Sequence, residues 1–163
     1  MAAGFPLFID LTGNNCTIFG GGKDTVRRAE ALLAFGAKVT VISPSICPQL
    51  MNMRDAGRIR HIPRKYYRGD CSQSQLCVAA TDEAKINIDI ATECKSKGIP
   101  VNVTEPRVYG NFQFPRVIVW DGIVMSISGD IPAEKLRKLQ KKLEDAVPEM
   151  MSEISAEKEK GIG

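Results

Sequence analysis

The sequence predicts an α/β fold: a parallel sheet with crossover helices, followed by a small C-terminal hairpin and helix. From Cys16 to about Val103, short β-rich runs alternate with helical patterns, as parallel strands joined by helices require. A run of three glycines at residues 20–22 directly follows the first apolar run. After Pro115 the pattern changes to two β-like runs and a long amphipathic segment.

Five segments have the length and composition of buried strands. Each is short and apolar, which is typical of parallel strands that are covered on both faces. The predicted strands are residues 16–19, 38–42, 58–62, 76–80 and 100–103.

The first crossover helix is predicted by apolar residues at helical spacing, namely Val26, Ala29, Leu32 and Leu33. Gly36 stands where such a helix would end in the left-handed conformation.

A second helix is predicted over residues 83–97. Thr81 or Asp82 is expected to cap it, and Gly98 to end it. It returns the chain to the fifth strand.

The segment after Pro115 predicts a hairpin. Residues 117–120 and 123–128 are β-like and are joined by Asp121 and Gly122, a strong turn signal.

A charged helix is predicted from Pro132 onward. Pro148 is expected to break or kink it, leaving residues 149–163 as a second short helix or a frayed tail. The apolar residues expected on one face are Leu136, Leu139 and Leu143.

Composition excludes several classes of protein. Among 163 residues, 44% are hydrophobic and 25% charged, which argues against disorder and fibrous folds. No stretch approaches the ~20 apolar residues of a membrane span, and no secretion signal is visible, so a cytoplasmic protein is expected. A net charge of +3 is too small to demand nucleic acid as a partner.

The five cysteines are predicted to be reduced thiols rather than metal ligands, because no two have C-x-x-C spacing. His61 is the only histidine and falls in a predicted strand, so a structural role is favoured over a catalytic one. The cysteines are Cys16, Cys47, Cys71, Cys77 and Cys94.

The glycine run between the first strand and the first helix predicts a dinucleotide-binding domain of the Rossmann type. Gly20 would permit a tight turn, and Gly22 would let a pyrophosphate approach the helix N-terminus. Thr25 replaces the third glycine of the fingerprint and is expected to loosen the packing of helix on strand. The alternative is a glycine-rich turn without a ligand.

The end of the second strand does not choose between NAD and NADP. Ile42 is followed by Ser43, Pro44 and Ser45, where an acidic residue would bind the ribose of NAD.

A basic stretch between residues 54 and 68 could attract a polyanion. Charge runs usually face water, however, so a solvated strand edge and loop is favoured. Its basic residues are Arg54, Arg58, Arg60, His61, Arg64, Lys65 and Arg68.

Several of these signals occur together in one order. The chain resembles the dehydrogenase-ferrochelatase part of siroheme synthases and the stand-alone precorrin-2 dehydrogenases, over about residues 6–148. The resemblance depends on residues 6–11, 20–28, 78–83 with Asn87, 98–103 and 111–115.

The resemblance implies NAD-dependent oxidation of precorrin-2 to sirohydrochlorin, followed in some members by insertion of iron. By position, it implies cofactor contacts in the phosphate loop, after the second strand and beside the nicotinamide. These residues are Lys23 and Asp24, Pro44 and Ser45, and Thr81.

Glu105 stands where the resemblance implies a catalytic aspartate, just after the Val-Asn-Val strand. This position lies beyond the carboxyl end of a strand, where open α/β sheets bind ligands, so proton transfer is a reasonable role. The alternative is a solvent-exposed loop glutamate.

Two departures from the family keep other functions open. Residues 128–132 form a shorter loop than the family shows, and the family's helical C-terminal domain is largely absent. One alternative is a sirohydrochlorin ferrochelatase in which Glu105 or Asp130 accepts protons. Another is a nucleotide- or tetrapyrrole-binding protein without catalysis.

We expect two regions, an NAD-binding domain over residues 1–114 and a shortened dimerisation segment over residues 115–163. A two-stranded hairpin is marginal in water, and with one helix it cannot close a core. A homodimer is therefore predicted, with a tetrapyrrole as substrate and no nucleic acid or membrane as partner.

Overall fold

The computed structural model describes residues 4–160, with side chains as far as residue 156. The chain divides into two compact units. One is Ile9–Phe114, and the other combines the segment before Ile9 with the segment after Phe114. The expected first region began at residue 1, but residues 4–8 are exposed, lack regular structure and group with the C-terminal unit.

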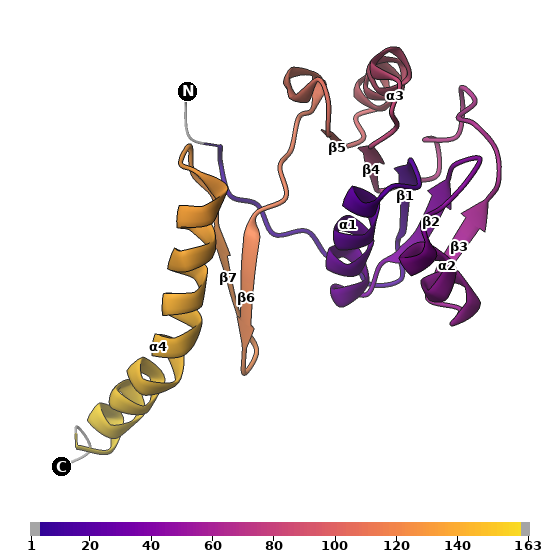
Figure 1. Cartoon of the computed structure of the whole chain (residues 1–163). Coiled ribbons are helices and arrows are strands. Elements are labelled where there is room, and N and C mark those ends of the chain that lie inside the picture. Colours follow the sequence, from indigo (N-terminus) through magenta and orange to yellow (C-terminus); the bar gives the residue numbers. More distant parts are fainter. Residues whose placement is uncertain (1–3, 161–163) are drawn as a thin grey trace. The chain divides into compact units, whose positions relative to one another are not determined.

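The unit Ile9–Phe114 contains a five-stranded parallel sheet in the order β3-β2-β1-β4-β5 (Figure 1). The predicted strands are confirmed to within one residue at each end. They are β1 (Asn15–Phe19), β2 (Lys38–Ile42), β3 (Ile59–Ile62), β4 (Leu76–Ala79) and β5 (Val101–Val103).

Helices cover both faces of the sheet. Leu32 of α1 (Lys23–Ala34) and Leu50 of α2 (Pro48–Asp55) belong to one buried cluster, and Ile90 of α3 (Ala84–Ser96) belongs to another. The sequence did not predict α2, because eight residues hold too few apolar positions to show a helical period.

The glycine stops of the first two predicted helices are confirmed, since Gly36 and Gly98 have φ of 76° and 68°. The predicted caps of the second helix are wrong. Its N-cap is Glu83, which makes no side-chain capping hydrogen bond. The short 3-10 helix η1 (Arg107–Tyr109) follows β5.

The other unit contains the predicted hairpin, formed by β6 (Arg116–Trp120) and β7 (Ile123–Ile127). Asp121 and Gly122 both have positive φ, 43° and 79°, as a tight turn between twisted strands requires.

Helix α4 (Ala133–Lys160) continues through Pro148, so of the expected break or kink the break is wrong, and residues 149–160 belong to the same helix. The rest of the expected last segment, residues 161–163, lies outside the described residues. Proline removes one hydrogen bond to the carbonyl four residues earlier, that of Glu144. Pro148 and Glu144 are both exposed, so water can solvate that carbonyl.

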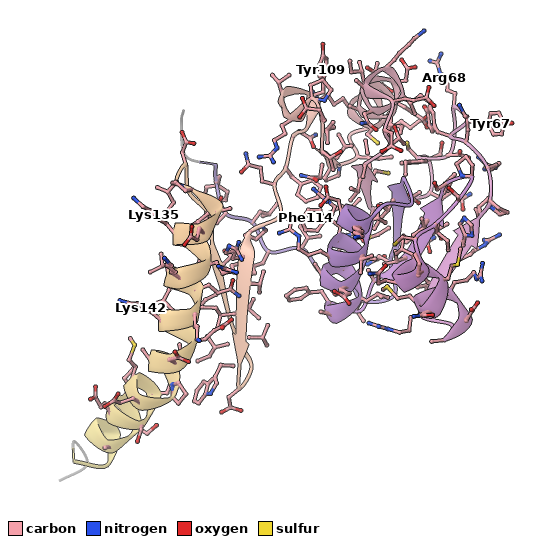
Figure 2. The ribbon with its side chains drawn as sticks, in the orientation of Figure 1. Tyr67, Arg68, Tyr109, Phe114, Lys135 and Lys142 are labelled. Carbon is pink, nitrogen blue, oxygen red and sulfur yellow. The ribbon has the colours of Figure 1, made fainter. Side chains whose placement is uncertain are left out.

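One side of α4 contacts the hairpin, with Gln140 Nε2 donating to the Val117 carbonyl oxygen at 3.1 Å. Lys135 and Lys142 point away from the hairpin (Figure 2). Of the three leucines expected on one face, Leu139 is 41% exposed, whereas Leu136 and Leu143 are half-buried. Within residues 4–160, no helix is both long and apolar enough to cross a bilayer.

Candidate functional site

Two clefts open beside the glycine turn between β1 and α1. The order of the strands reverses at β1: the chain first adds β2 and β3 on one side of β1, and then adds β4 and β5 on its other side. Open α/β sheets bind ligands beyond the carboxyl ends of their strands at such a switch point.

Two of the three glycines are required by close backbone contacts. Gly20 has φ of 116°, and a Cβ there would lie 2.1 Å from the Ala80 carbonyl oxygen. A Cβ on Gly21 would lie 1.9 Å from the Ser45 carbonyl oxygen. The tight turn predicted at Gly20 is confirmed. The close contact at Gly21 was not predicted, because the run of three glycines is the only sign of it in the sequence.

Gly22 differs from its two neighbours because a Cβ there would meet no atom within 4 Å. It is the N-cap of α1, and no side chain caps that helix. The first N–H groups of a helix lack partners within the helix and carry its positive dipole end, so this turn is suited to an anion.

Thr25 does not loosen the packing of α1. Its side chain is buried, and its hydroxyl donates to the Gly20 carbonyl oxygen at 2.9 Å. The hydrogen bond holds the glycine turn against the helix, so the expectation drawn from the missing third glycine is corrected.

The narrower cleft has a volume of about 200 Å³ and lies on the side of the turn nearer β2. Near its wall, His61 Nε2 lies 2.8 Å from the Ser43 carbonyl oxygen, which supports the structural role predicted for that histidine. The cleft is lined by residues 20–22, 42–45, Lys65, Tyr66, 80–83 and Ile86.

The wider cleft has a volume of about 640 Å³ and reaches toward the end of β5. It shares Gly22 and residues 80–82 with the narrower cleft, so the two adjoin. Its lining is Gly22, Lys23, Asp24, Thr25, Ala80, Thr81, Asp82, Thr104 and Glu105.

Asn87 joins the ends of β4 and β5 beneath the wider cleft. Its Nδ2 donates to the carbonyl oxygens of Thr81 and Glu105, at 3.0 and 2.8 Å. Its Oδ1 accepts from the Thr81 N–H and hydroxyl, at 3.0 and 2.8 Å. The side chain is 1% exposed, so these bonds fix both loops from inside the protein.

The Glu105 side chain is exposed and lines the wider cleft together with two other carboxylates, Asp24 and Asp82. Its backbone is held by Asn87, while its carboxylate is free to meet a ligand. This position allows proton transfer at the rim of the cleft.

A buried polar network lies behind the narrower cleft. The Tyr66 hydroxyl, the Gly69 N–H and Lys97 Nζ all donate to the Glu93 carboxylate. Burial and the bond to Glu93 raise the pKa of Tyr66. Burial alone would raise the pKa of Glu93, but the three hydrogen bonds outweigh it and lower that pKa to about 2.

The basic stretch is partly neutralised by its own neighbours. Arg64 forms a two-pronged pair with Asp70 at 2.7 and 2.8 Å, and Lys65 pairs with Glu83 at 2.9 Å. Tyr67 and Arg68 point outward from the loop after β3 (Figure 2). These contacts favour the solvated strand edge and loop over a polyanion site.

The structure brings all the predicted site residues to the two adjoining clefts. What each does there remains a prediction, and Asn87 and Gly21 are the additional residues that shape the site. The predicted residues are Gly20, Gly22, Pro44, Ser45 and Thr81 at the narrower cleft and Lys23, Asp24 and Glu105 at the wider one.

The chain is similar to known proteins in sequence and in fold. A family model described as "Putative NAD(P)-binding" matches residues 7–116. The chain is 32% identical over 157 residues to a siroheme synthase of Pseudoalteromonas atlantica, covering 96% of this chain and 34% of that protein. It is 31% identical over 146 residues to a siroheme synthase of Chromobacterium violaceum, covering 88% and 31%.

The chain therefore spans about a third of the length of these curated relatives. Among solved structures it is similar to "SirC, precorrin-2 dehydrogenase", with a TM-score of 0.68 and 23% identity. That match covers 86% of this chain and 70% of the other, and it shows a shared fold.

Proposed function

This chain belongs to the putative NAD(P)-binding family, and from that membership we propose that it oxidises precorrin-2 to sirohydrochlorin with NAD. The substrate is suggested by the siroheme synthases and the precorrin-2 dehydrogenase that the chain resembles.

One observation supports the proposal most directly. Two adjoining clefts flank Gly22, the N-cap of α1. No side chain caps the helix there, and a Cβ on Gly22 would meet no atom within 4 Å. The turn would bind a pyrophosphate, and each cleft would take one half of a dinucleotide. Bound NAD would supply the hydride acceptor, which the side chains of the protein lack.

The choice of NAD over NADP comes from the resemblance to the precorrin-2 dehydrogenases. Residues 43–45, after β2, contain neither an acid for the ribose of NAD nor an arginine or lysine for a 2′-phosphate. Lys65 also lines the narrower cleft, but its ammonium is paired with Glu83 at 2.9 Å.

Oxidation of precorrin-2 removes a hydride and a proton from the macrocycle. We assign the proton to the Glu105 carboxylate, because it is exposed on the wider cleft and its backbone is held by Asn87. We expect the reaction in the cytoplasm, where the chain's cysteines, all free thiols, stay reduced.

The test is anaerobic incubation of the purified chain with precorrin-2 and NAD. We expect sirohydrochlorin absorbance to appear together with an equal amount of NADH, and neither product when NAD is omitted. Replacing NAD by NADP should slow the reaction. If no sirohydrochlorin forms although NAD binds, the chain is a cofactor-binding protein and the proposed activity is wrong.

A further inference from the structure

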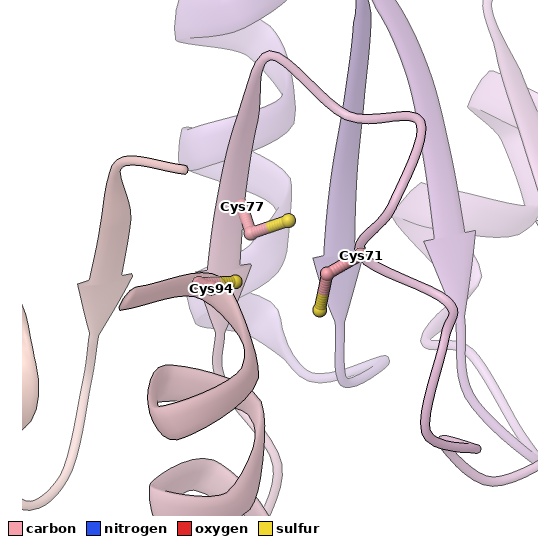
Figure 3. A group of neighbouring side chains, drawn as sticks. All are labelled: Cys71, Cys77 and Cys94. Carbon is pink, nitrogen blue, oxygen red and sulfur yellow. The ribbon is translucent and has the colours of Figure 1, made fainter. Parts of the chain in front are cut away.

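Three cysteines that are far apart in the sequence lie close together in the buried cluster that includes Ile90 of α3 (Figure 3). Cys77 lies in β4, Cys94 in the last turn of α3, and Cys71 in the loop between β3 and β4. Their Sγ atoms all lie within 4.8 Å of one another. We refer to these three residues as the thiol cluster.

We propose that the thiol cluster binds a single thiophilic d10 cation, Cu⁺ or Zn²⁺. Cysteine thiolates prefer these ions over the hard cations that oxygen ligands bind. With a metal–sulfur distance of about 2.3 Å, three sulfurs around one ion stand about 4 Å apart. The cluster is therefore within a small side-chain adjustment of that geometry.

Burial distinguishes this cluster from a redox sensor. All three side chains are 0% exposed, whereas cysteines that sense oxidants are accessible to solvent. A closed, water-free shell is instead typical of a structural metal site. Binding would displace the thiol protons, and the ion would cancel part of the resulting negative charge.

The ligands come from three elements, and the loop among them is already joined to α3 by the hydrogen bonds of Tyr66 and Gly69 to Glu93. Residues 63–75 form a loop without helix or strand, and Cys71 lies within it. An ion would fasten this loop to β4 and α3. Because the loop supplies one ligand, the ion can enter before the loop closes during folding.

The number of ligands separates the two candidate ions. Among the described residues, no histidine or carboxylate joins the three sulfurs as a fourth ligand. Cu⁺ is satisfied by three thiolates, whereas Zn²⁺ in structural sites takes four ligands and would require a water molecule or the hydroxyl of Ser74, which is now hydrogen-bonded to Thr17 at 2.7 Å.

The experiment is elemental analysis of the chain, purified under reducing conditions from cells grown with added zinc or added copper. We expect about one ion per chain in one of the two preparations. Cys71→Ser and Cys94→Ser should lose it. Cys16→Ser is the matched control, because Cys16 is equally buried but lies outside the cluster, and it should keep the ion.

A second measurement stays informative if the variants fail to fold. The wild-type chain is stripped of metal, refolded with Zn²⁺ or Cu⁺, and its thermal midpoint is compared with that of the apo protein. A rise of about 10 °C is expected when the free ion is at about a hundred times its dissociation constant. No bound metal and an unchanged midpoint, or a mass lower by two hydrogens from a disulfide, would overturn the proposal.

Discussion

Single residues at the glycine turn have separable roles. Gly20 and Gly21 are required by the protein itself, because a Cβ on either would overlap a backbone oxygen. Gly22 is not, because the space beside it is open. The fold therefore does not require glycine at position 22, and the open space there is where we propose that the pyrophosphate binds.

Gly22→Val should abolish cofactor binding without unfolding the protein, because the new side chain fills only the space above the helix N-terminus. Calorimetric titration with NAD and thermal melting measure the two effects. Gly20→Ala is the contrasting variant. Positive φ and a clash with Ala80 should lower its stability by at least about 2 kcal/mol. Retained NAD affinity in folded Gly22→Val would remove the phosphate loop from the proposed site.

Glu105→Gln should lower turnover by about 10² to 10⁴-fold and leave NAD affinity nearly unchanged, because it removes a proton acceptor but no cofactor contact. Single-turnover oxidation of precorrin-2 is the measurement. Asp82→Asn removes a charge from the same cleft and serves as the control, with a loss below about tenfold.

Glu105→Asp adds a test of geometry. A displacement of about 1 Å can change a rate by about 10²-fold, so the direction of its effect shows which side-chain length the loop supports. If all the variants at position 105 keep the wild-type rate, Glu105 is a solvated loop residue.

At the scale of elements, the site depends on a connection between two strands. The ends of β4 and β5 carry Thr81 and Glu105, and Asn87 of α3 bonds to both. A helix on one face of the sheet thus holds the residues that line the wider cleft.

Asn87→Ala should destabilise the chain by about 2 to 4 kcal/mol, because the backbone groups of Thr81 and Glu105 lose the hydrogen bonds of a buried side chain. Chemical denaturation measures the loss, and turnover should fall with it because the two loops are no longer fixed. Asn52→Ala, at an exposed position of α2, is the control and should change stability by less than about 0.5 kcal/mol. Equal effects of the two variants would contradict the role of Asn87.

Pro148→Ala should stabilise α4, because alanine restores the missing N–H in an uninterrupted helix and has the better helix propensity. Higher helical ellipticity and a higher thermal midpoint are expected. A lower midpoint would show that the chain needs the proline at this position.

At the scale of the whole molecule, the unit that contains the hairpin and α4 has little core of its own. Among its described side chains, only two hydrophobic residues are buried, Ile118 and Val147. Several large apolar side chains are exposed, including Val119 at 63%. A two-fold partner would cover this surface.

The chain should therefore be a dimer at micromolar concentration by light scattering. Val119→Lys should weaken the dimer, because a charge would enter the interface, yet leave the fold intact. Met51→Lys is the control, since Met51 is 41% exposed on α2 of the other unit. A stable wild-type monomer would exclude the dimer.

The sequence alone determined the strands, the helix stops and the hairpin turn. These features depend on local chemistry, such as the period of apolar residues and the backbone freedom of Gly36, Gly98 and Gly122. The glycine turn could be located for the same reason, since the backbone conformations that glycine allows are a property of one residue.

Only the tertiary structure decided what depends on distant segments. Glycine is needed at position 21 because the backbone of Ser45 lies against it. Asn87 forms hydrogen bonds with the loops that follow two separate strands. The helix through Pro148 persists because water can reach the freed carbonyl of Glu144. The thiol cluster was invisible because wide spacing along the chain gives no information about distance once a sheet has folded.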